Sequence, residues 1–423
     1  MATQSTTRAD RIIARCREIA SFTEVPGETT RTFLSPPMHE VHTLLRQWME
    51  AAGMTVHIDA IGNLRSLYPG LTPNAPRLLI ASHLDTVPNA GVFDGILGVV
   101  LGLAVVEELR NQRLPFAIEV IGFSEEEGVR FNKPFLGSLA LIGKLGTETL
   151  ARTDSDGTSL TKAIRNYGLN PDELSSVVMS NNTFAYLEFH IEQGPILESE
   201  SSPLGIVNTI AGQTRLQLTF TGQSNHAGTT PMHLRRDALA AAAEWIVATE
   251  ACANRHADLV ATVGRIDATP GAINVIPGEV TASLDLRHHN DDLRQSAIAS
   301  LLDSATAIAS RRNVKVSPQL LSQQDAVPMN AHLTHLLYLA ASQAGHPSRI
   351  MTSGAGHDAM IIAPQIPSAM LFLRTPGGLS HHPDESVLPQ DVEAALATAM
   401  EFLTLLRDAL SLHNRSIPKD AHA

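Results

Sequence analysis

The hydrophobic positions of the chain fall into two patterns. Residues 1–208 and 322–423 contain short runs of consecutive apolar residues, such as the run at 77–82, which are typical of strands buried on both faces. Residues 214–221 instead alternate polar and apolar side chains, as in a strand with one exposed face. The change in pattern predicts a discontinuous α/β domain, residues 1–208 and 322–423, with an inserted α+β domain at 209–321.

Periodicity also predicts the individual elements. In the α/β domain, apolar spacings of three and four predict helices at 9–21, 38–53, 96–109, 331–344 and 390–412. Strands are predicted there at 54–59, 64–68, 77–82, 115–123, 185–190 and 368–374. The insert is expected to hold strands at 214–221, 258–266, 279–287 and 313–320, and helices at 235–250 and 291–310. This βαββαβ order resembles a ferredoxin-like unit.

Composition narrows the class of protein. The 423 residues are 43% hydrophobic, yet no apolar run reaches the roughly 18 residues of a membrane span. A net charge of −12 argues against a nucleic-acid partner. The N-terminus lacks the apolar segment of a signal peptide and predicts a polar tail followed by a helix. Cys16 and Cys252 have no CxxC neighbours, which excludes a disulfide framework and a cysteine zinc site and favours a cytoplasmic location.

The segment 77–95 carries the first candidate chemistry. His83 ends a predicted strand and Asp94 opens a predicted helix, a position where α/β folds place ligand sites. His83 can offer one ring nitrogen to a metal while Asp85 holds the other, and the two oxygens of Asp94 can bridge two cations. For this segment alone, a hydrogen-bonded histidine in a turn and an aspartate that caps the helix explain the pattern equally well.

Four further candidate ligands end or follow other predicted strands: Glu126, Glu127, His190 and His381. Because parallel strands bring their carboxyl ends to one edge of a sheet, these side chains are expected to converge. Imidazoles and carboxylates without thiolates favour zinc, manganese or cobalt over softer metals. One carboxylate must stay off the metal to act as general base.

The candidate residues lie in a series of motifs. In chain order these are His83-x-Asp85, Asp94-Gly95, Glu126-Glu127-Gly128-x-Arg130-Phe131, His190-Ile-Glu-Gln-Gly-Pro and Ser380-His381-x-Pro383-x-Glu385. Over residues 9–412, the series resembles the M20 metallopeptidase-like amidohydrolases of the hydantoinase/carbamoylase branch. The resemblance implies an M20-type catalytic domain with a mixed, largely parallel sheet, and an inserted lid and dimerisation domain.

The resemblance also implies two divalent metal ions per subunit, zinc or manganese, with cobalt as a further possibility. Asp94 would bridge the ions, His83 and His190 would complete one site, and Glu127 and His381 would complete the other. Glu126 would be the general base that deprotonates the attacking water and passes the proton to the leaving nitrogen. Five further residues lie near these motifs or have suitable side chains but are not expected to bind metal: Glu125, His288, His289, His357 and His382.

Substrate contacts are implied by the same resemblance. His226 would reach the partner subunit's active site and stabilise the oxyanion, which implies a homodimer. Asn274 and Arg287 would hold the substrate carboxylate, and Gln213 and Gly356 also match substrate-contact positions. Without the resemblance, the segment around His226 is a turn and helix cap, Arg287 is a structural ion pair, and Gly356 is a plain turn.

The motif details point to a substrate class. Arg31-Thr-Phe-Leu-Ser35 and Met370-Leu-Phe-Leu-Arg374 look most like allantoate amidohydrolases, especially the plant type. This likeness implies cleavage of a C–N bond of a small ureido acid, namely allantoate to ureidoglycine or ureidoglycolate with release of ammonia and CO₂. The alternatives are N-carbamoyl-L-amino acid hydrolase or β-ureidopropionase, then ureidoglycolate amidohydrolase, and a non-catalytic relative. Arg374 either adds positive charge near the substrate or forms a structural ion pair.

Overall fold

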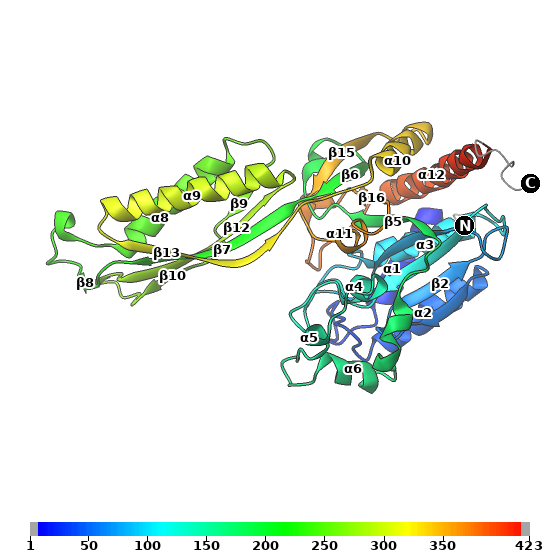
Figure 1. Cartoon of the computed structure of the whole chain (residues 1–423), viewed down its shortest axis with the longest axis horizontal. Helices are drawn as coiled ribbons and strands as arrows, with labels where there is room; N and C mark the ends of the chain where they lie inside the picture. The colour runs from blue at the N-terminus through cyan, green and yellow to red at the C-terminus, as the bar shows by residue number, and fades with distance from the viewer. Residues whose placement is uncertain (1–6, 416–423) are drawn as a thin grey trace, which may run out of the picture. The chain divides into compact units, whose positions relative to one another are not determined.

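The computed structural model describes residues 7–415 and divides the chain into two compact units. The first unit comprises Met1–Asn208 and Pro328–Ala423, and the second comprises Thr209–Val327 (Figure 1). The expected boundary at 321/322 would cut through strand β13 (Lys315–Gln324), which stays paired along its neighbour to Gln324, so the second unit ends later. The first six residues of the predicted N-terminal tail lie outside the described residues.

A mixed sheet forms the core of the first unit. Its strands are β1 (Thr55–Ile58), β2 (Leu64–Tyr68), β3 (Arg77–His83), β4 (Ala117–Phe123), β5 (Thr183–Ile191), β6 (Leu204–Ile210), β14 (Val327–Pro328), β15 (Ser348–Ser353) and β16 (Ser368–Leu373). The order is β1-β2-β4-β3-β5-β16-β6-β14, with β15 beside β6. The central strands β4, β3, β5 and β16 are mutually parallel, whereas β1, β2 and β6 pair antiparallel. The sheet was expected to be mixed and largely parallel; that it is mixed is confirmed, and its parallel part is the four central strands.

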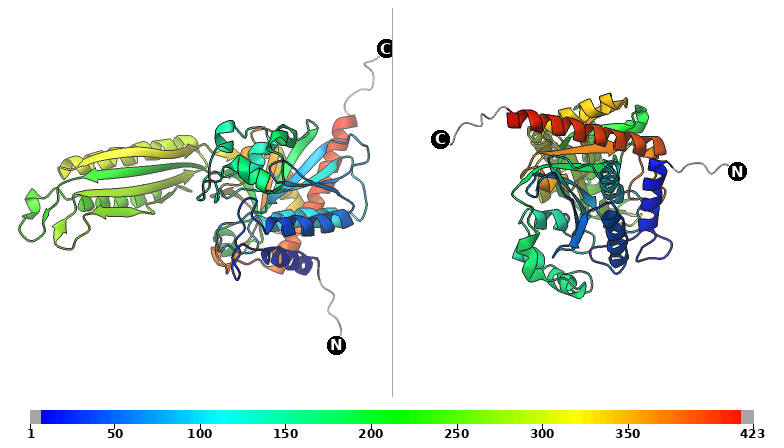
Figure 2. Two further views of the ribbon diagram at one scale, coloured as in Figure 1. Left: turned by 90° about the horizontal axis from the view of Figure 1, so that it is seen from below. Right: turned by 90° about the vertical axis from the view of Figure 1, so that its right-hand side faces the viewer.

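Helices surround this sheet. They are α1 (Arg8–Ala20), α2 (Met38–Ala51), α3 (Ile96–Glu108), α4 (Leu136–Leu141), α5 (Thr147–Leu150), α6 (Leu160–Asn166), η1 (Pro171–Val177), α7 (Ile196–Ser199), α10 (Ala331–Gln343), α11 (Ala359–Ile362), η3 (Pro376–Gly378) and α12 (Pro389–Arg415). Helix α3 packs on β3, β4 and β5. Helix α10 lies along α12, at the top of the right-hand view of Figure 2. No helix within residues 7–415 combines the length and apolarity needed to cross a membrane.

Burial of β3 and β4 explains why their sequences read as continuous apolar runs. Every residue of β4, and every residue of β3 after Arg77, is buried, because both strands lie inside the sheet between β2 and β5 and helix α3 packs on them. The parallel arrangement places the carboxyl ends of β3, β4, β5 and β16 at one edge. The helices between residues 136 and 177 were not predicted, since each is too short to carry a clear period. Strands β6 and β15 were not predicted either.

The second unit has one sheet and two long helices. Its elements are β7 (Gly212–Thr221), β8 (Asn225–His226), η2 (Met232–Leu234), α8 (Ala238–Ala253), β9 (Val260–Thr262), β10 (Ile266–Thr269), β11 (Val275–Ile276), β12 (Glu279–His288), α9 (Asp291–Arg311) and β13. Strand order β10-β12-β7-β13 is antiparallel throughout, the order of a ferredoxin-like sheet. Helices α8 and α9 lie side by side on one face of the sheet (Figures 1 and 2).

Two predicted elements of this unit differ from the structure. The single strand expected at 258–266 is two short strands, β9 and β10, which pair with separate parts of β12. The helix expected from 235 begins at Ala238, because the Asp237 side chain accepts hydrogen bonds from the backbone N–H groups of Leu239 and Ala240 and so caps it. The division of the strand follows from its pairing with β12, and the start of the helix is set by hydrogen bonding rather than by periodicity.

Candidate metal centre

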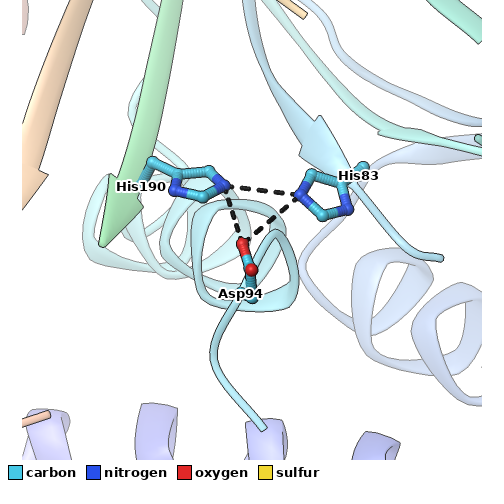
Figure 3. Close-up of side chains that lie close together, drawn as sticks. All are labelled: His83, Asp94 and His190. Carbon is cyan, nitrogen blue, oxygen red and sulfur yellow. Dashed lines mark hydrogen bonds and ion pairs between the residues drawn. The ribbon is translucent and has the colours of Figure 1, made fainter. Parts of the chain in front are cut away.

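Three side chains converge at the carboxyl edge of the parallel strands. His83 is the last residue of β3, His190 lies near the end of β5, and Asp94 stands just before α3 (Figure 3). The two Nε2 atoms are 3.3 Å apart, and Asp94 Oδ1 lies 3.6 Å from that of His83 and 3.1 Å from that of His190. All three residues are buried. The structure thus brings together residues that are 107 positions apart in the chain.

The backbone fixes the orientation of both imidazoles. Nδ1 of His83 lies 3.0 Å from the carbonyl oxygen of Asp85, and Nδ1 of His190 lies 3.0 Å from that of Ile191. Since a carbonyl oxygen only accepts, each Nδ1 carries a hydrogen and donates it. Each Nε2 therefore points toward Asp94, which is the arrangement in which a histidine presents its lone pair to a metal ion.

The donor set fits a cation. Asp94 Oδ1 is buried and has no hydrogen-bond partner among the described residues. With both Nδ1 atoms already donating, this oxygen and two Nε2 lone pairs face one another, so positive charge is needed between them. Protons or a metal ion can supply that charge. An environment that stabilises protonated imidazoles also stabilises a divalent cation bound by nitrogen and oxygen.

A second group shares Asp94. Its other oxygen, Oδ2, lies 3.2 Å from His381 Nε2, which in turn lies 3.4 Å from Glu127 Oε1. Candidate ligand atoms of Asp94, Glu127 and His381 all lie within 4.8 Å of one another. The carboxylate of Asp94 thus faces two different groups of ligands, one with each oxygen.

Glu126 lies beside both groups. Together with His83 and Glu127 it forms a third set of groups close enough to hold an ion. Its backbone N–H donates to Asp85 Oδ1 at 3.0 Å, and the N–H of Glu127 donates to Asp85 Oδ2 at 3.1 Å. The Asp85 carboxylate therefore fixes the segment that carries both glutamates. The backbone carbonyl of Asp85 also accepts the hydrogen bond from His83 Nδ1. The sequence prediction gave Asp85 only the contact with His83.

Charge and burial oppose one another throughout the cluster. Burial raises the pKa of the Glu126 carboxyl well above its usual range, and the neighbouring Glu127 and Asp358 raise it further. For Asp94, burial works against ionisation, but the three surrounding histidines outweigh it and hold the pKa well below its usual range. Contacts with Asp94 and Glu127 raise the pKa of His381 to about 10. The cluster therefore keeps Asp94 ionised and gives Glu126 a high affinity for a proton.

Two residues that hold Asp94 were missed at the sequence level. Gln193 Nε2 donates to Asp94 Oδ2 at 3.0 Å, and Ser380 Oγ donates to the same oxygen at 3.2 Å. Gln193 has a left-handed backbone, with φ of 60°. Both residues lie inside the quoted motifs, close to a ligand histidine. Nothing in the spacing of the motifs indicates that their side chains point toward Asp94.

The residues singled out in the second unit form two pairs. His226 lies on β8 opposite Val275 of β11, and the N–H of Ala227 donates to the carbonyl of Asn274 at 2.9 Å, so His226 and Asn274 are neighbours. Gln213 and Arg287 are direct partners across β7 and β12. The pair of Gln213 and Arg287 lies at the start of β7, next to Gly212. The pair of His226 and Asn274 lies beyond Thr221, at the other end of β7 (Figure 1).

His226 is exposed, and its tautomer is defined. The N–H of Gly228 donates to His226 Nδ1 at 3.0 Å, so Nδ1 is the acceptor and Nε2 carries the hydrogen in the neutral ring. His226 can therefore donate a hydrogen bond through an exposed Nε2.

The arginines are both paired with aspartates. Arg287 donates through Nε and Nη2 to the two oxygens of Asp285, at 2.8 and 2.9 Å. Arg374 makes the same bidentate contact with the fully buried Asp391, at 2.8 and 2.9 Å. The structural ion pair that was one alternative for Arg374 is therefore present.

Gly356 lies in the first unit, in the segment between β15 and α11. A Cβ there would come within 3.1 Å of Phe135 Cζ, so the ring leaves little space for a side chain. His357, the next residue, is buried with its Nε2 2.9 Å from Ser353 Oγ. Among the described residues, His357 belongs to none of the candidate metal groups, and the same holds for Glu125, His288, His289 and His382.

Comparison with known proteins identifies the class. The model of peptidase family M20/M25/M40 matches residues 79–405. Allantoate deiminase 1 of Glycine max is 38% identical, covering 93% of this chain and 89% of that protein. N-carbamoyl-L-amino acid amidohydrolase of Geobacillus stearothermophilus is also 38% identical, covering 91% of this chain and 95% of that protein. The crystal structure of a hydantoinase/carbamoylase family amidase from Burkholderia multivorans superimposes with a TM-score of 0.88 at 33% identity, covering 94% of this chain and 97% of that one.

The chain belongs to peptidase family M20/M25/M40, as its motifs predicted. Within that family, these relatives place it in the hydantoinase/carbamoylase branch.

Proposed function

We propose that the chain is a metal-dependent amidohydrolase that cleaves a C–N bond of a small ureido acid, with allantoate as the preferred substrate. The observation that carries the proposal is the convergence of His83, Asp94 and His190 next to a second group around His381, with Glu126 beside both. The plant allantoate deiminases, 36–38% identical over 93% of the chain, supply the substrate class.

The ligand assignment follows from which oxygen of Asp94 faces which group. His83 and His190 would hold one divalent ion with Oδ1, and Glu127 and His381 would hold the second with Oδ2. Zinc or manganese suits these nitrogen and oxygen donors, and cobalt is the further possibility. When bound, such ions polarise the substrate carbonyl and make water more acidic.

Glu126 would act as the general base. Asp85 fixes its backbone, and its carboxyl has a raised pKa, so it readily accepts a proton from the attacking water and returns it to the leaving nitrogen. Glu127 lies next in the chain but faces His381, which supports different roles for the two glutamates. The products from allantoate would be ureidoglycine, or ureidoglycolate after further hydrolysis, with ammonia and CO₂.

The substrate contacts require two subunits in this proposal. Asn274 and Arg287 would hold the substrate carboxylate, His226 would stabilise the oxyanion, and Gln213 and Gly356 would make further contacts with the substrate. Between Gln213 and Thr221 the strand rises about 27 Å, at roughly 3.4 Å per residue. Since a small ureido acid is far shorter, one subunit cannot bring both pairs to the same molecule. A homodimer in which His226 donates its Nε2 hydrogen to the partner's substrate resolves this conflict.

The alternative substrate class is the N-carbamoyl-L-amino acids. The bacterial amidohydrolase of that name is as similar as the plant enzymes, with 38% identity over 91% of the chain. The same ligands and base serve either substrate, so the choice depends on the pocket. A cytoplasmic location is part of the proposal and is supported by the free, buried state of Cys16 and Cys252.

The test compares substrates and variants in one experiment. Enzyme stripped with a chelator and reloaded with Mn²⁺ or Zn²⁺ is given allantoate, N-carbamoyl-L-amino acids and ureidoglycolate, and ammonia release is measured. We expect chelation to abolish turnover, reloading to restore it, and allantoate to be preferred by at least about tenfold in kcat/KM, or about 1.4 kcal/mol.

Glu126→Gln should lower kcat by a factor of about 10²–10⁴ while metal content stays at the wild-type level. The matched control is Glu125→Gln, since Glu125 is also buried but belongs to none of the candidate metal groups among the described residues. A preference for N-carbamoyl amino acids would show that allantoate is not the preferred substrate and would leave the proposed mechanism unchanged. Full activity in the Glu126→Gln variant would rule out its role as base.

A further inference from the structure

Glu385 is a buried carboxylate that is in contact with the proposed metal centre but is not one of its ligands. Its Oε1 accepts hydrogen bonds from the backbone N–H groups of Phe93, at 2.9 Å, and Asp94, at 3.0 Å. The residue is only 4% exposed. Burying a carboxyl group at this depth is costly unless hydrogen bonds compensate for the lost contact with water.

The loop before α3 is shaped around this side chain. A Cβ at Gly91 would overlap Glu385, so the backbone passes the carboxylate where only glycine fits. The two donated N–H groups belong to consecutive residues just before Gly95, the N-cap of α3. Glu385 thus ties its own turn to the backbone at Asp94, while the side-chain oxygen Oδ2 of Asp94 is held separately by Gln193 and Ser380.

Glu385 also belongs to the turn that carries His381. The N–H of Glu385 donates to the carbonyl of His382 at 3.0 Å, which closes the turn. His381 has a left-handed backbone with φ of 55°, and its side chain is 47% exposed. A non-glycine residue in this conformation is strained and persists only where its surroundings hold it.

The other histidines need no such support. His83 and His190 lie on buried central strands, and a backbone carbonyl holds each Nδ1. His381 lies on a turn, eight residues beyond the end of β16. The two groups of ligands therefore differ in how rigidly the fold holds them.

We propose that Glu385 is a positioning residue for the second metal ion, because it fastens the His381 turn to the backbone of Asp94. The inference rests on the proposed two-metal centre and adds that the two ions depend unequally on this carboxylate. Loss of Glu385 weakens the ion held by Glu127 and His381 and leaves the ion held by His83 and His190 in place.

The test measures metal binding, not turnover. Chelator-stripped, full-length enzyme is titrated with Mn²⁺ in equilibrium dialysis, and the number of ions and their dissociation constants are determined per subunit. Wild type should bind two ions. Glu385→Leu, which removes the acceptor, should bind the first ion as wild type does and the second about 10–100-fold more weakly, the range typical for partners that orient metal ligands.

Three matched variants make the result specific. Glu385→Gln keeps a carbonyl oxygen for the two N–H groups and should restore the second ion to near wild-type affinity. His381→Ala removes a proposed ligand, and its dissociation constant for the second ion shows how far binding falls when that ligand is lost. Glu385→Asp keeps the charge but is one methylene too short, so it should weaken the second ion, and it decides the question if Glu385→Leu does not fold.

The possible failures are distinguishable. If Glu385→Leu and Glu385→Asp bind both ions like wild type, or lose both ions equally, Glu385 is not a positioning residue for the second site. If wild type itself binds fewer than two ions, the proposed metal centre fails, and this inference fails with it.

Discussion

His42 illustrates at the residue scale how burial changes a titratable side chain away from the metal centre. Its Nδ1 lies 3.0 Å from the hydroxyl of Tyr167, with which it shares a hydrogen bond. The residue is 2% exposed, and burial, with a smaller effect of His39, lowers its pKa to about 3. In an unfolded chain the pKa of histidine is about 6.5.

The sign of the pH effect follows from this difference. Below about pH 6.5 the unfolded chain binds a proton at His42 that the folded protein does not, so stability present above that pH is lost as the pH falls. Near pH 5 the loss from this residue is about 2 kcal/mol in the free energy of unfolding. We expect His42→Gln, which keeps a hydrogen-bonding group for Tyr167, to lose less stability than wild type between pH 7 and pH 5. Urea unfolding at both pH values measures this, and equal losses would contradict it.

Arg374 and Asp391 illustrate at the element scale how an ion pair joins two segments. Arg374 directly follows β16, and Asp391 is in the first turn of α12. The guanidinium makes two hydrogen bonds to a carboxylate that is 0% exposed. Removing the arginine would leave a buried charge without a partner, which is far more costly than losing a surface pair.

Arg374→Met should therefore lower the free energy of unfolding by about 3 kcal/mol. Because the arginine is engaged with Asp391, the ratio of kcat/KM for allantoate and N-carbamoyl amino acids should stay the same. Chemical denaturation and the two substrate assays measure these effects. The double variant Arg374→Met/Asp391→Leu should recover most of the lost stability. A changed substrate ratio with unchanged stability would instead favour a role near the substrate.

Helices and strands were predicted correctly where a regular pattern of apolar residues extends over a long segment. The prediction failed where strand pairing sets the bounds of an element. The alternating pattern of β7 and β12 comes from one face that is buried against the helices and one face that is partly exposed, so the sequence shows it directly. Strands β9 and β10 have three and four residues, and their division depends on which parts of β12 they pair with. Such pairing is nonlocal and leaves no period in the chain.

At the scale of the whole molecule, the separation of the two residue pairs in the second unit leads to a test of the homodimer. If His226 acts in the partner's site, a dimer of one His226→Ala subunit and one Glu126→Gln subunit contains one intact site and one doubly defective site. If His226 acts in its own subunit, both sites of the mixed dimer are defective.

Mixing the two inactive variants in equal amounts and allowing subunit exchange should therefore restore about a quarter of wild-type activity, since half of the dimers are mixed and each has one working site. Ammonia release measures the recovery, and tagged subunits confirm that exchange took place. Exchange without recovered activity would show that His226 does not act in trans.

The sequence by itself determined the family, the fold class and the set of candidate ligands. Apolar runs and helical spacing follow from burial of each element, and the motif residues are chemically distinctive, so both are visible along the chain. Only the tertiary structure decided which oxygen of Asp94 faces which histidine, that Asp85 holds the backbone of Glu126, and that Glu385 holds that of Asp94. The physical reason is that these are directional contacts between segments far apart in the chain. Sequence spacing records which groups are available, whereas folding alone sets the distance and angle at which they meet.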